Sequence, residues 1–237
     1  MGSLVLVPTP IHDPLPLEPE ALALLQKIAL DPDWTLLVEE LKTARTRWLR
    51  WGLTREAIAR FVTLNEHDQA DSAKTVLDSL RNGGSAVLIS DCGLPAFCDP
   101  GRILIDACHR EGIRVTSTPF PNSIALAVAL SGFPHEQFFF AGFLPADSAG
   151  RKQALDRLSR IEEPIVLMDT PYRFRALLED IAKSRLQGRQ AFIATELNSR
   201  EERLFRGFLP DLLKKTGGIE KPEFVLVLNA TQAGRRN

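Results

Sequence analysis

Short apolar runs alternate with amphipathic segments along the whole chain of 237 residues. The runs at 4–7, 86–89 and 165–168 have the length of strands and consist mostly of Val, Ile and Leu. Segments such as 19–28 instead repeat their apolar residues at helical spacing, and Pro19 suits a first helical turn. This alternation is typical of α/β proteins, in which helices cover the faces of a sheet. The sequence therefore predicts an α/β fold.

The same patterns predict the other elements. Glycine and threonine at 52–54 divide the basic segment 42–60 into two helical parts, because Gly ends helices and Thr caps them. Further helices are expected at 71–81, 102–110, 123–131, 150–160 and 172–184. Further strands are expected at 35–38, 113–115, 138–141, 190–195, 203–206 and 223–228.

A proline-containing stretch at 118–121 marks the expected boundary between two α/β domains, 1–119 and 120–237. The charge also changes there. The first part has 12 basic and 16 acidic residues, a net charge of −4, and the second has 17 and 14, a net charge of +3. The total of −1 argues against a protein coated with basic residues for nucleic-acid binding, although a local basic patch stays compatible with it.

Composition and missing motifs exclude several classes of protein. Apolar residues make up 44% of the chain, so it has enough material for a core. No apolar run is long enough to span a bilayer, and the N-terminal segment lacks the basic region of a signal peptide, which predicts a cytoplasmic protein. Neither a G-x-G-x-x-G nor a P-loop motif is present, and the four histidines are far apart, so no metal is expected. Cys92, Cys98 and Cys108 are predicted to be buried free thiols.

The segment 90–101, S-D-C-G-L-P-A-F-C-D-P-G, directly follows the apolar strand at 86–89. Ligands of open α/β sheets bind just beyond the carboxyl ends of strands. Gly93 would let the backbone approach a ligand closely, and the Asp91 carboxylate accepts hydrogen bonds. A ligand-binding loop and a tight structural loop are both compatible with these residues.

Eight segments, in order along the chain, resemble the tetrapyrrole methylase superfamily of S-adenosylmethionine-dependent methyltransferases. The most specific is 90–101, which is similar to the family's S-D-A-G-T-P-x-x-x-D-P-G stretch. The closest branch is the one that methylates the 2′-oxygen of cytidine in small-subunit ribosomal RNA. The other segments that resemble family motifs are 6–11, 64–67, 120–123, 131–134, 140–145, 169–173 and 195–197.

This resemblance implies two α/β domains with S-adenosylmethionine held between them, and a homodimer. The family does not use a glycine-rich Rossmann loop, which agrees with the absence of that motif. The resemblance also implies that five loops contact the cofactor. Their residues are Pro8, Thr9, Pro10, Asp91, Cys92, Gly93, Leu94, Asn122, Ser123, Met168, Asp169, Thr170 and Leu197.

Methyl transfer to a hydroxyl group can use a base, and Glu66, His67 and Glu196 are the candidates. Each has a structural alternative. His67 can be a helix-entry residue that makes structural hydrogen bonds, and Glu196 can be an ion-pair partner of Arg200 or Arg203. The sequence assigns no base.

Basic residues gather in segment 42–60, which has six of them against one acidic residue and also contains Trp48 and Trp51. Such a surface attracts phosphates and stacks on bases, so Arg45 is a candidate substrate contact. A second, shorter patch at 172–175 makes Arg173 another. The alternative is a solvated helix whose tryptophans pack on the core or on a dimer partner.

The leading hypothesis is a methyltransferase of RNA, at a ribose 2′-oxygen of ribosomal RNA by resemblance. A second hypothesis keeps the cofactor but has a small-molecule acceptor such as a tetrapyrrole, because the net charge is near zero. A third is a degenerate binding protein that has lost catalysis, because Leu94 stands where the family has threonine and Phe120 where it has glycine. All three predict binding of S-adenosylmethionine.

Overall fold

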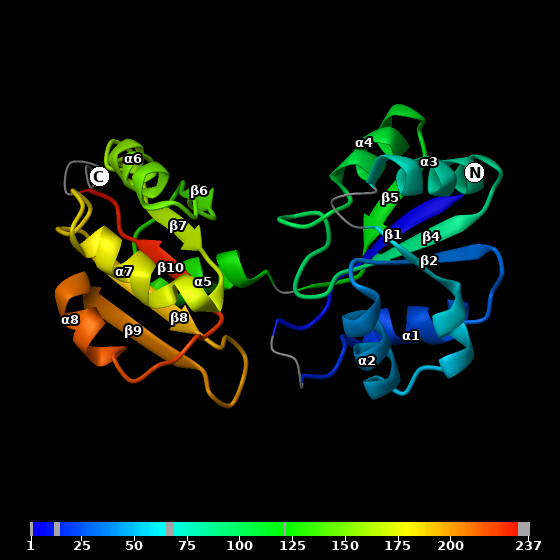
Figure 1. The fold of residues 1–237 in the computed structure, drawn as a ribbon, viewed down its shortest axis with the longest axis horizontal. Helices are drawn as coiled ribbons and strands as arrows, with labels where there is room; N and C mark the ends of the chain where they lie inside the picture. The colour runs from blue at the N-terminus through cyan, green and yellow to red at the C-terminus, as the bar shows by residue number, and fades with distance from the viewer. Residues whose placement is uncertain (1, 12–14, 65–68, 121, 232–237) are drawn as a thin grey trace. The chain divides into compact units, whose positions relative to one another are not determined.

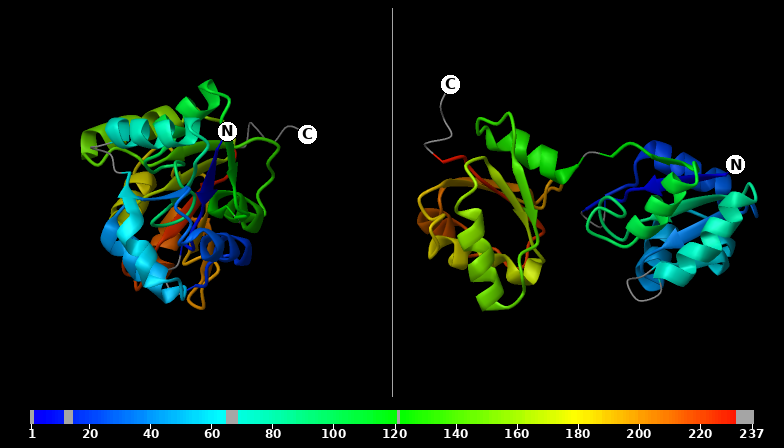
Figure 2. Two further views of the ribbon diagram at one scale, coloured as in Figure 1. Left: turned by 90° about the vertical axis from the view of Figure 1, so that its right-hand side faces the viewer. Right: turned by 90° about the horizontal axis from the view of Figure 1, so that it is seen from above.

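The computed structural model describes residues 2–11, 15–64, 69–120 and 122–231. The chain divides into two compact units, Met1–Phe120 and Pro121–Asn237, called here the N-unit and the C-unit. Each unit is a five-stranded sheet with helices packed on it (Figures 1 and 2). The α/β class predicted from the sequence is confirmed.

The N-unit sheet is parallel throughout, with the strand order β3-β2-β4-β1-β5. Parallel strands all end at the same edge of the sheet, so the loops that follow them emerge side by side. We call this edge, with the loops 8–11, 39–40 and 90–101, the N-unit edge. The strands are β1 (Ser3–Val7), β2 (Trp34–Val38), β3 (Phe61–Thr63), β4 (Ser85–Ile89) and β5 (Arg114–Ser117).

Helices cover both faces of the N-unit sheet, which explains why β4 is apolar along its length. Helices α1 (Pro19–Ile28) and α2 (Leu41–Arg50) pack on one face, and α3 (Gln69–Arg81) and α4 (Arg102–Arg110) on the other (Figure 1). The short 3-10 helix η1 (Arg55–Arg60) follows α2. Helix α2 begins directly after β2 because the Glu40 carboxylate accepts hydrogen bonds from the backbone N–H groups of Lys42 and Thr43, its second and third residues.

The C-unit sheet is mixed, with the order β6-β7-β10-β8-β9. Strands β6, β7 and β8 run in one direction, and β9 and β10 run against them. The loops after β6, β7 and β8 therefore lie at one edge, together with the turn that precedes β10. We call it the C-unit edge. The strands are β6 (Phe139–Gly142), β7 (Ile165–Met168), β8 (Gln190–Thr195), β9 (Arg203–Phe208) and β10 (Phe224–Leu228).

The two faces of the C-unit sheet are covered unequally. Helix α5 (Ser123–Ser131) packs on one face against residues such as Phe192 and Val225. The other face carries α6 (Ser148–Leu158), α7 (Phe174–Ala182) and α8 (Leu209–Lys215), with the short 3-10 helix η2 (Pro171–Arg173) before α7. Within the described residues, no helix is both long enough and apolar enough to cross a membrane.

Some local predictions were incomplete or wrong. The sequence patterns missed β3 and α8, both short elements. All three cysteines are free, and Cys108 is buried as predicted, but Cys92 and Cys98 are exposed. The prediction of buried thiols is wrong for these two because they lie in the loop beyond β4 rather than in the core.

Candidate cofactor and substrate site

At the N-unit edge, the loops after β1 and β4 are joined although they lie about 80 residues apart in the sequence. The Thr9 backbone N–H donates to the Gly93 carbonyl at 2.9 Å, and the Gly93 N–H donates to the Thr9 carbonyl at 3.1 Å. The hydroxyl groups of Thr9 and Ser90 lie 3.3 Å apart, and Thr9 is fully buried. Two of the predicted cofactor loops, 8–10 and 91–94, are thus brought together by their backbones.

Arg47 of α2 fixes the first of these loops. Its Nη1 atom donates to Thr9 Oγ1 at 2.9 Å and to the Pro10 carbonyl at 3.2 Å. The side chain is only 8% exposed, which is unusual for arginine. The sequence placed Arg47 in the basic segment 42–60, and its role at the loop was missed because nothing in the local pattern distinguishes it from its exposed neighbours.

Two acidic side chains meet where β2 and β4 end. The Asp91 backbone N–H lowers the pKa of Glu39, and the Glu40 backbone N–H lowers that of Asp91, while Glu39 Oε1 is buried without a hydrogen-bond partner among the described residues. Burial, with the negative charge of Asp99 as the next largest cause, raises the pKa of Glu39 to about 8. Burial also raises the pKa of Asp91 to about 6, whereas the backbone N–H of Glu40 lowers it. Sequence reasoning selected Asp91 and missed Glu39.

Only part of the basic segment 42–60 faces solvent. The guanidinium of Arg60 donates to the carbonyls of Ala29, Asp31 and Trp34. Trp48 is buried, and its Nε1 donates to the Thr54 carbonyl at 2.8 Å. The structural alternative is therefore confirmed for Trp48, whereas Arg45 is exposed. The candidates Glu66 and His67 lie outside the described residues.

Asp169 follows β7 at the C-unit edge, and its side chain is fully buried. Its Oδ1 accepts a hydrogen bond from the Thr170 N–H at 2.8 Å. Its Oδ2 has no hydrogen-bond partner and forms an ion pair with Arg173 Nη2 at 3.1 Å. Burial raises the pKa of Asp169, and the hydrogen bond from Thr170 is the largest cause that lowers it.

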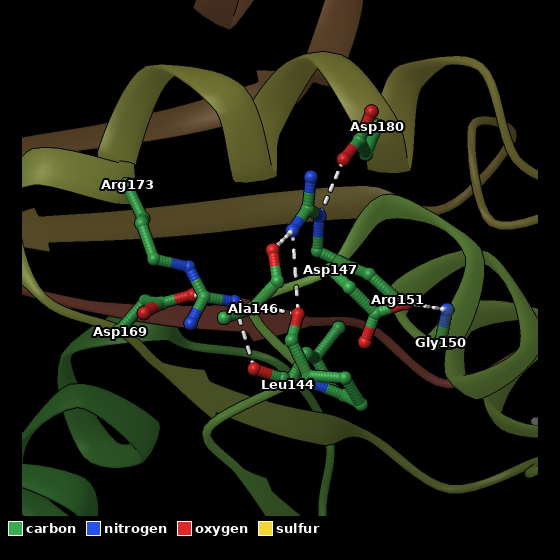
Figure 3. Close-up of polar contacts among 9 residues, drawn as sticks. Leu144, Ala146, Asp147, Gly150, Arg151, Asp169, Arg173 and Asp180 are labelled. Carbon is green, nitrogen blue, oxygen red and sulfur yellow. Dashed lines mark hydrogen bonds and ion pairs between the residues drawn. The ribbon is translucent and has the colours of Figure 1, made fainter.

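Two arginines hold the loop that follows β6 (Figure 3). Arg173 Nη2 donates to the carbonyls of Leu144 at 2.7 Å and Pro145 at 2.9 Å. Arg151 Nη1 donates to the carbonyls of Pro145 at 3.3 Å and Ala146 at 2.7 Å, while its Nε donates to Asp180 at 2.5 Å. The substrate candidate Arg173 is thus engaged with the protein's own backbone and with Asp169.

Glu196 follows β8 and is tied to the start of β10. Its backbone N–H donates to the Glu223 carbonyl at 2.9 Å, and its Oε1 accepts from the Glu223 N–H at 2.9 Å. Its neighbour Leu197, a predicted cofactor contact, is buried. Burial, and then the charge of Glu196, raise the pKa of Glu223. The Glu196 carboxylate thus has a structural role, because it holds the backbone at the turn before β10.

Backbone strain is concentrated at the two edges. Among the described residues other than glycine, a positive φ occurs at Glu196 (+49°), Asn198 (+64°), Lys221 (+47°) and Ala96 (+61°). The first three lie at the C-unit edge, and Ala96 lies in the 90–101 loop. Such conformations are costly and cluster at functional sites, so this distribution favours both edges as functional.

The remaining predicted cofactor residues lie at the start of α5 and after β7. Asn122 caps α5, since its Oδ1 accepts from the N–H groups of Ile124 and Ala125, and Ser123 is half-buried beside it. Met168 is half-buried, and Thr170 is exposed.

The groups at the N-unit edge fit the polar parts of S-adenosylmethionine. Carboxylates and backbone carbonyls accept hydrogen bonds from amino and hydroxyl groups, which this cofactor presents. Gly93 has φ +78°, and no atom lies within 4 Å of where its Cβ would be, so its backbone is open on that side. Among the described residues, no group of three or more His, Cys, Asp or Glu side chains could hold a metal ion.

The chain is thus a two-unit α/β protein, with one parallel and one mixed sheet and with strained loops at one edge of each. The family model for Tetrapyrrole (Corrin/Porphyrin) Methylases matches residues 4–213, and the chain belongs to this family. It is an S-adenosylmethionine-dependent methyltransferase.

Similar curated proteins share a name. The ribosomal RNA small subunit methyltransferase I of Thermotoga maritima is 35% identical over 208 residues, which cover 87% of this chain and 88% of the relative. The protein of that name from Escherichia coli O157:H7 is 30% identical over 235 residues, which cover 98% of this chain and 79% of the relative.

Solved structures share the fold at lower identity. The uroporphyrin-III C-methyltransferase of Thermus thermophilus, complexed with S-adenosyl homocysteine, has a TM-score of 0.54 and 18% identity, covering 96% of this chain and 97% of that one. A diphthine synthase has a TM-score of 0.66 and 14% identity, covering 97% of this chain and 90% of that one. These likenesses define the fold alone.

Proposed function

We propose that this methyltransferase modifies RNA of the small ribosomal subunit, at a ribose 2′-oxygen. The observation that carries the proposal is the similarity to ribosomal RNA small subunit methyltransferase I, which extends over 98% of the chain and therefore over both units. The solved structures reported above also cover both units, but they carry other names and share only 18% and 14% identity with this chain. The higher identity to the ribosomal RNA enzymes, 35% and 30%, therefore supports a shared substrate.

The cofactor contacts are proposed at both edges. In the N-unit they are the loops 8–10 and 91–94, whose joined backbones leave Gly93 open. In the C-unit they are 122–123 at the start of α5, 168–170 after β7 and Leu197 after β8. When bound there, S-adenosylmethionine supplies an electrophilic methyl group on its sulfonium. Backbone groups held by hydrogen bonds suit the task because methyl transfer depends mainly on orientation.

The acceptor side draws on different residues. Arg45 is exposed on α2 and is proposed to contact RNA phosphates. Glu66 and His67 are proposed as groups that take up the proton of the acceptor hydroxyl. Glu196 and Arg173 are weaker candidates for substrate contact because both are engaged with the protein's own backbone. We further propose a cytoplasmic homodimer, by resemblance to the family.

The experiment compares three methyl acceptors under the same conditions. Protein and tritiated S-adenosylmethionine are incubated with small ribosomal subunits from a strain that lacks the homologous enzyme, with protein-free small-subunit RNA, and with a tetrapyrrole. We expect label in the RNA of the subunits, recovered after nuclease digestion as a 2′-O-methylated nucleoside. Subunits that are already methylated serve as the control and should take up no label.

The alternatives have different outcomes. Label in the tetrapyrrole and none in RNA would indicate that the methyl acceptor is a small molecule. Binding of S-adenosylmethionine without label in any acceptor would indicate a degenerate binding protein. Asp91→Asn keeps the size of the Asp91 side chain at the N-unit edge but removes its negative charge. This variant should weaken the binding of S-adenosylmethionine in calorimetry, whichever molecule accepts the methyl group.

A further inference from the structure

Two aromatic side chains project from the C-unit edge into solvent. Tyr172 in η2 is 78% exposed, and Phe143, which directly follows β6, is 46% exposed. Aromatic rings are largely apolar, and soluble proteins usually bury most of their area. Exposed rings near a functional edge therefore suggest contact with a ligand that has flat, apolar faces.

The two rings are attached to one hydrogen-bonded frame. Tyr172 is next to Arg173, and Phe143 is next to Leu144, whose carbonyl accepts a hydrogen bond from Arg173. Arg173 is itself held by the buried Asp169 carboxylate (Figure 3). Because this frame restrains both backbones, the rings stand on a preorganised surface, which reduces the entropy lost when a ligand binds.

Positive charge accompanies the rings. Nζ of Lys221 lies 4.8 Å from the centre of the Tyr172 ring, and Lys221 has a φ of +47° in the turn before β10. A lysine held in a strained conformation beside an exposed ring brings a cation to where a phosphate could lie. The C-unit as a whole has 17 basic and 14 acidic residues, a net charge of +3.

We propose that Phe143, Tyr172 and Lys221 form a surface on which unpaired bases of the RNA substrate stack, with Lys221 contacting the backbone phosphate. The inference rests on the proposed function, and it adds the part of the protein that would recognise the RNA. Proteins read single-stranded RNA by stacking bases on aromatic rings and by pairing its phosphates with cations. Arg173 acts here as a positioning residue, since its donors are directed at Asp169, Leu144 and Pro145.

The test uses Phe143→Ala and Tyr172→Ala, with Tyr172→Trp as the variant that keeps a stacking ring. The matched control is Phe208→Ala. Phe208 is also 46% exposed, but it ends β9 at the opposite edge of the same sheet. For each variant, KM for small ribosomal subunits and kcat are measured by tritiated-methyl transfer. Calorimetry gives the Kd for S-adenosylmethionine, thermal unfolding reports the fold, and light scattering gives the oligomeric state.

We expect each alanine variant to raise KM for the subunits about 5- to 100-fold, which corresponds to the loss of the stacking energy of one base. Their kcat, cofactor Kd and melting temperature should stay near the wild-type values. Tyr172→Trp should restore KM, and Phe208→Ala should match wild type throughout. Lys221→Ala should raise KM less and make it less dependent on salt concentration, because one phosphate contact is removed.

Other outcomes overturn the inference. An unchanged KM in both alanine variants, with RNA methylated normally, overturns it and leaves the proposed function standing. A change of oligomeric state that accounts for the rise in KM assigns the rings to a protein interface instead. If the wild-type protein methylates no RNA at all, the proposed function and this inference fail together.

Discussion

Nη1 of Arg47 lies 2.9 Å from Oγ1 of Thr9, and both side chains are buried. The contact joins α2, which follows β2, to the loop that follows β1. The same arginine also donates to the Pro10 carbonyl, so one guanidinium sets both the side chain and the backbone of this loop. Because Thr9 is in turn paired with Gly93, the position of the 91–94 loop depends on Arg47 as well.

Replacing Arg47 should therefore affect cofactor binding from a distance. Arg47→Met keeps the apolar stem but removes the donors, leaving the Pro10 carbonyl without this partner. We expect the protein to lose about 1–3 kcal/mol of stability and to bind S-adenosylmethionine about tenfold more weakly. Urea unfolding and calorimetry measure the two effects. Lys42→Met, at an exposed position of the same helix, should change neither.

The elements of this fold could be predicted from the sequence far better than the contacts of its charged residues. Apolar runs and helical periodicity located most strands and helices, and residues 90–101 indicated a functional loop. Arg47 and Arg60, however, counted as members of a basic surface, although both donate to the protein's own carbonyl groups. Local sequence contains no sign of these contacts, because the accepting carbonyls lie 26–37 residues away along the chain.

The missed elements have a similar explanation. Strand β3 has three residues, too few to show alternation, and it forms only because β2 offers an edge for pairing. Helix α8 has seven residues and begins with Leu209 and Pro210, and this pair after the apolar residues of β9 favours the end of a strand. At the site, Glu39 was missed because the sequence alone does not show which acidic residues are buried.

The raised pKa of Glu39 predicts how stability depends on pH. Below about pH 4.5 the carboxyl is protonated in both the folded and the unfolded protein. Between there and pH 8 the folded protein keeps a proton that the unfolded chain has released, because burial raises the pKa of Glu39 to about 8. The free energy of unfolding therefore falls as pH rises through this window. Asp91, with its pKa raised to about 6, adds to the fall at the lower end.

Glu39→Gln tests this pH dependence by replacing the carboxyl group that takes up and releases the proton. Asp91, Asp99 and Arg47 are the charged groups that act on Glu39, and they remain in the variant. We expect the melting temperature of wild type to decline between pH 6 and pH 8 more steeply than that of Glu39→Gln, with no further divergence above about pH 8. Glu20→Gln removes an exposed carboxylate of α1 and should keep the wild-type slope. Parallel curves for wild type and Glu39→Gln would contradict the prediction.

The ion pair between Arg173 and Asp169 predicts a large loss of stability. Arg173→Ala leaves the fully buried Asp169 carboxylate without its cation and also releases the carbonyls of Leu144 and Pro145. We expect a loss of about 2–4 kcal/mol, measured by urea unfolding. Arg175→Ala is the control: it also releases a carbonyl, that of Leu213, but its ion pair with Glu179 is about half exposed instead of buried, so it should cost less than about 1 kcal/mol.

The second part of this prediction concerns Asp169 itself. Arg173→Ala combined with Asp169→Asn no longer buries an unpaired charge, so the double variant should recover part of the lost stability. A double variant that is no more stable than Arg173→Ala would show that the loss comes from the released carbonyls rather than from the buried charge.

Gly93 offers a way to separate strain from cofactor contact at the N-unit edge. Its φ of +78° makes alanine costly, by about 1 kcal/mol, although no atom lies within 4 Å of the new methyl group. Gly83, in the turn between α3 and β4, has a φ of +93° and equally open surroundings, but it lies at the opposite edge of the sheet. The two substitutions should therefore destabilise the protein by similar amounts.

Their effects on the cofactor should differ. Gly93→Ala places a methyl group in the space proposed for S-adenosylmethionine and should weaken its binding at least tenfold in calorimetry, whereas Gly83→Ala should leave the Kd unchanged. Gly101→Ala gives a third pattern, because its Cβ would lie 2.6 Å from Leu88 Cδ2 and 3.1 Å from Ala96 Cβ. It should cost more stability than either, since strain and overlap with the core add together. Equal Kd values for Gly93→Ala and Gly83→Ala would place the cofactor away from Gly93.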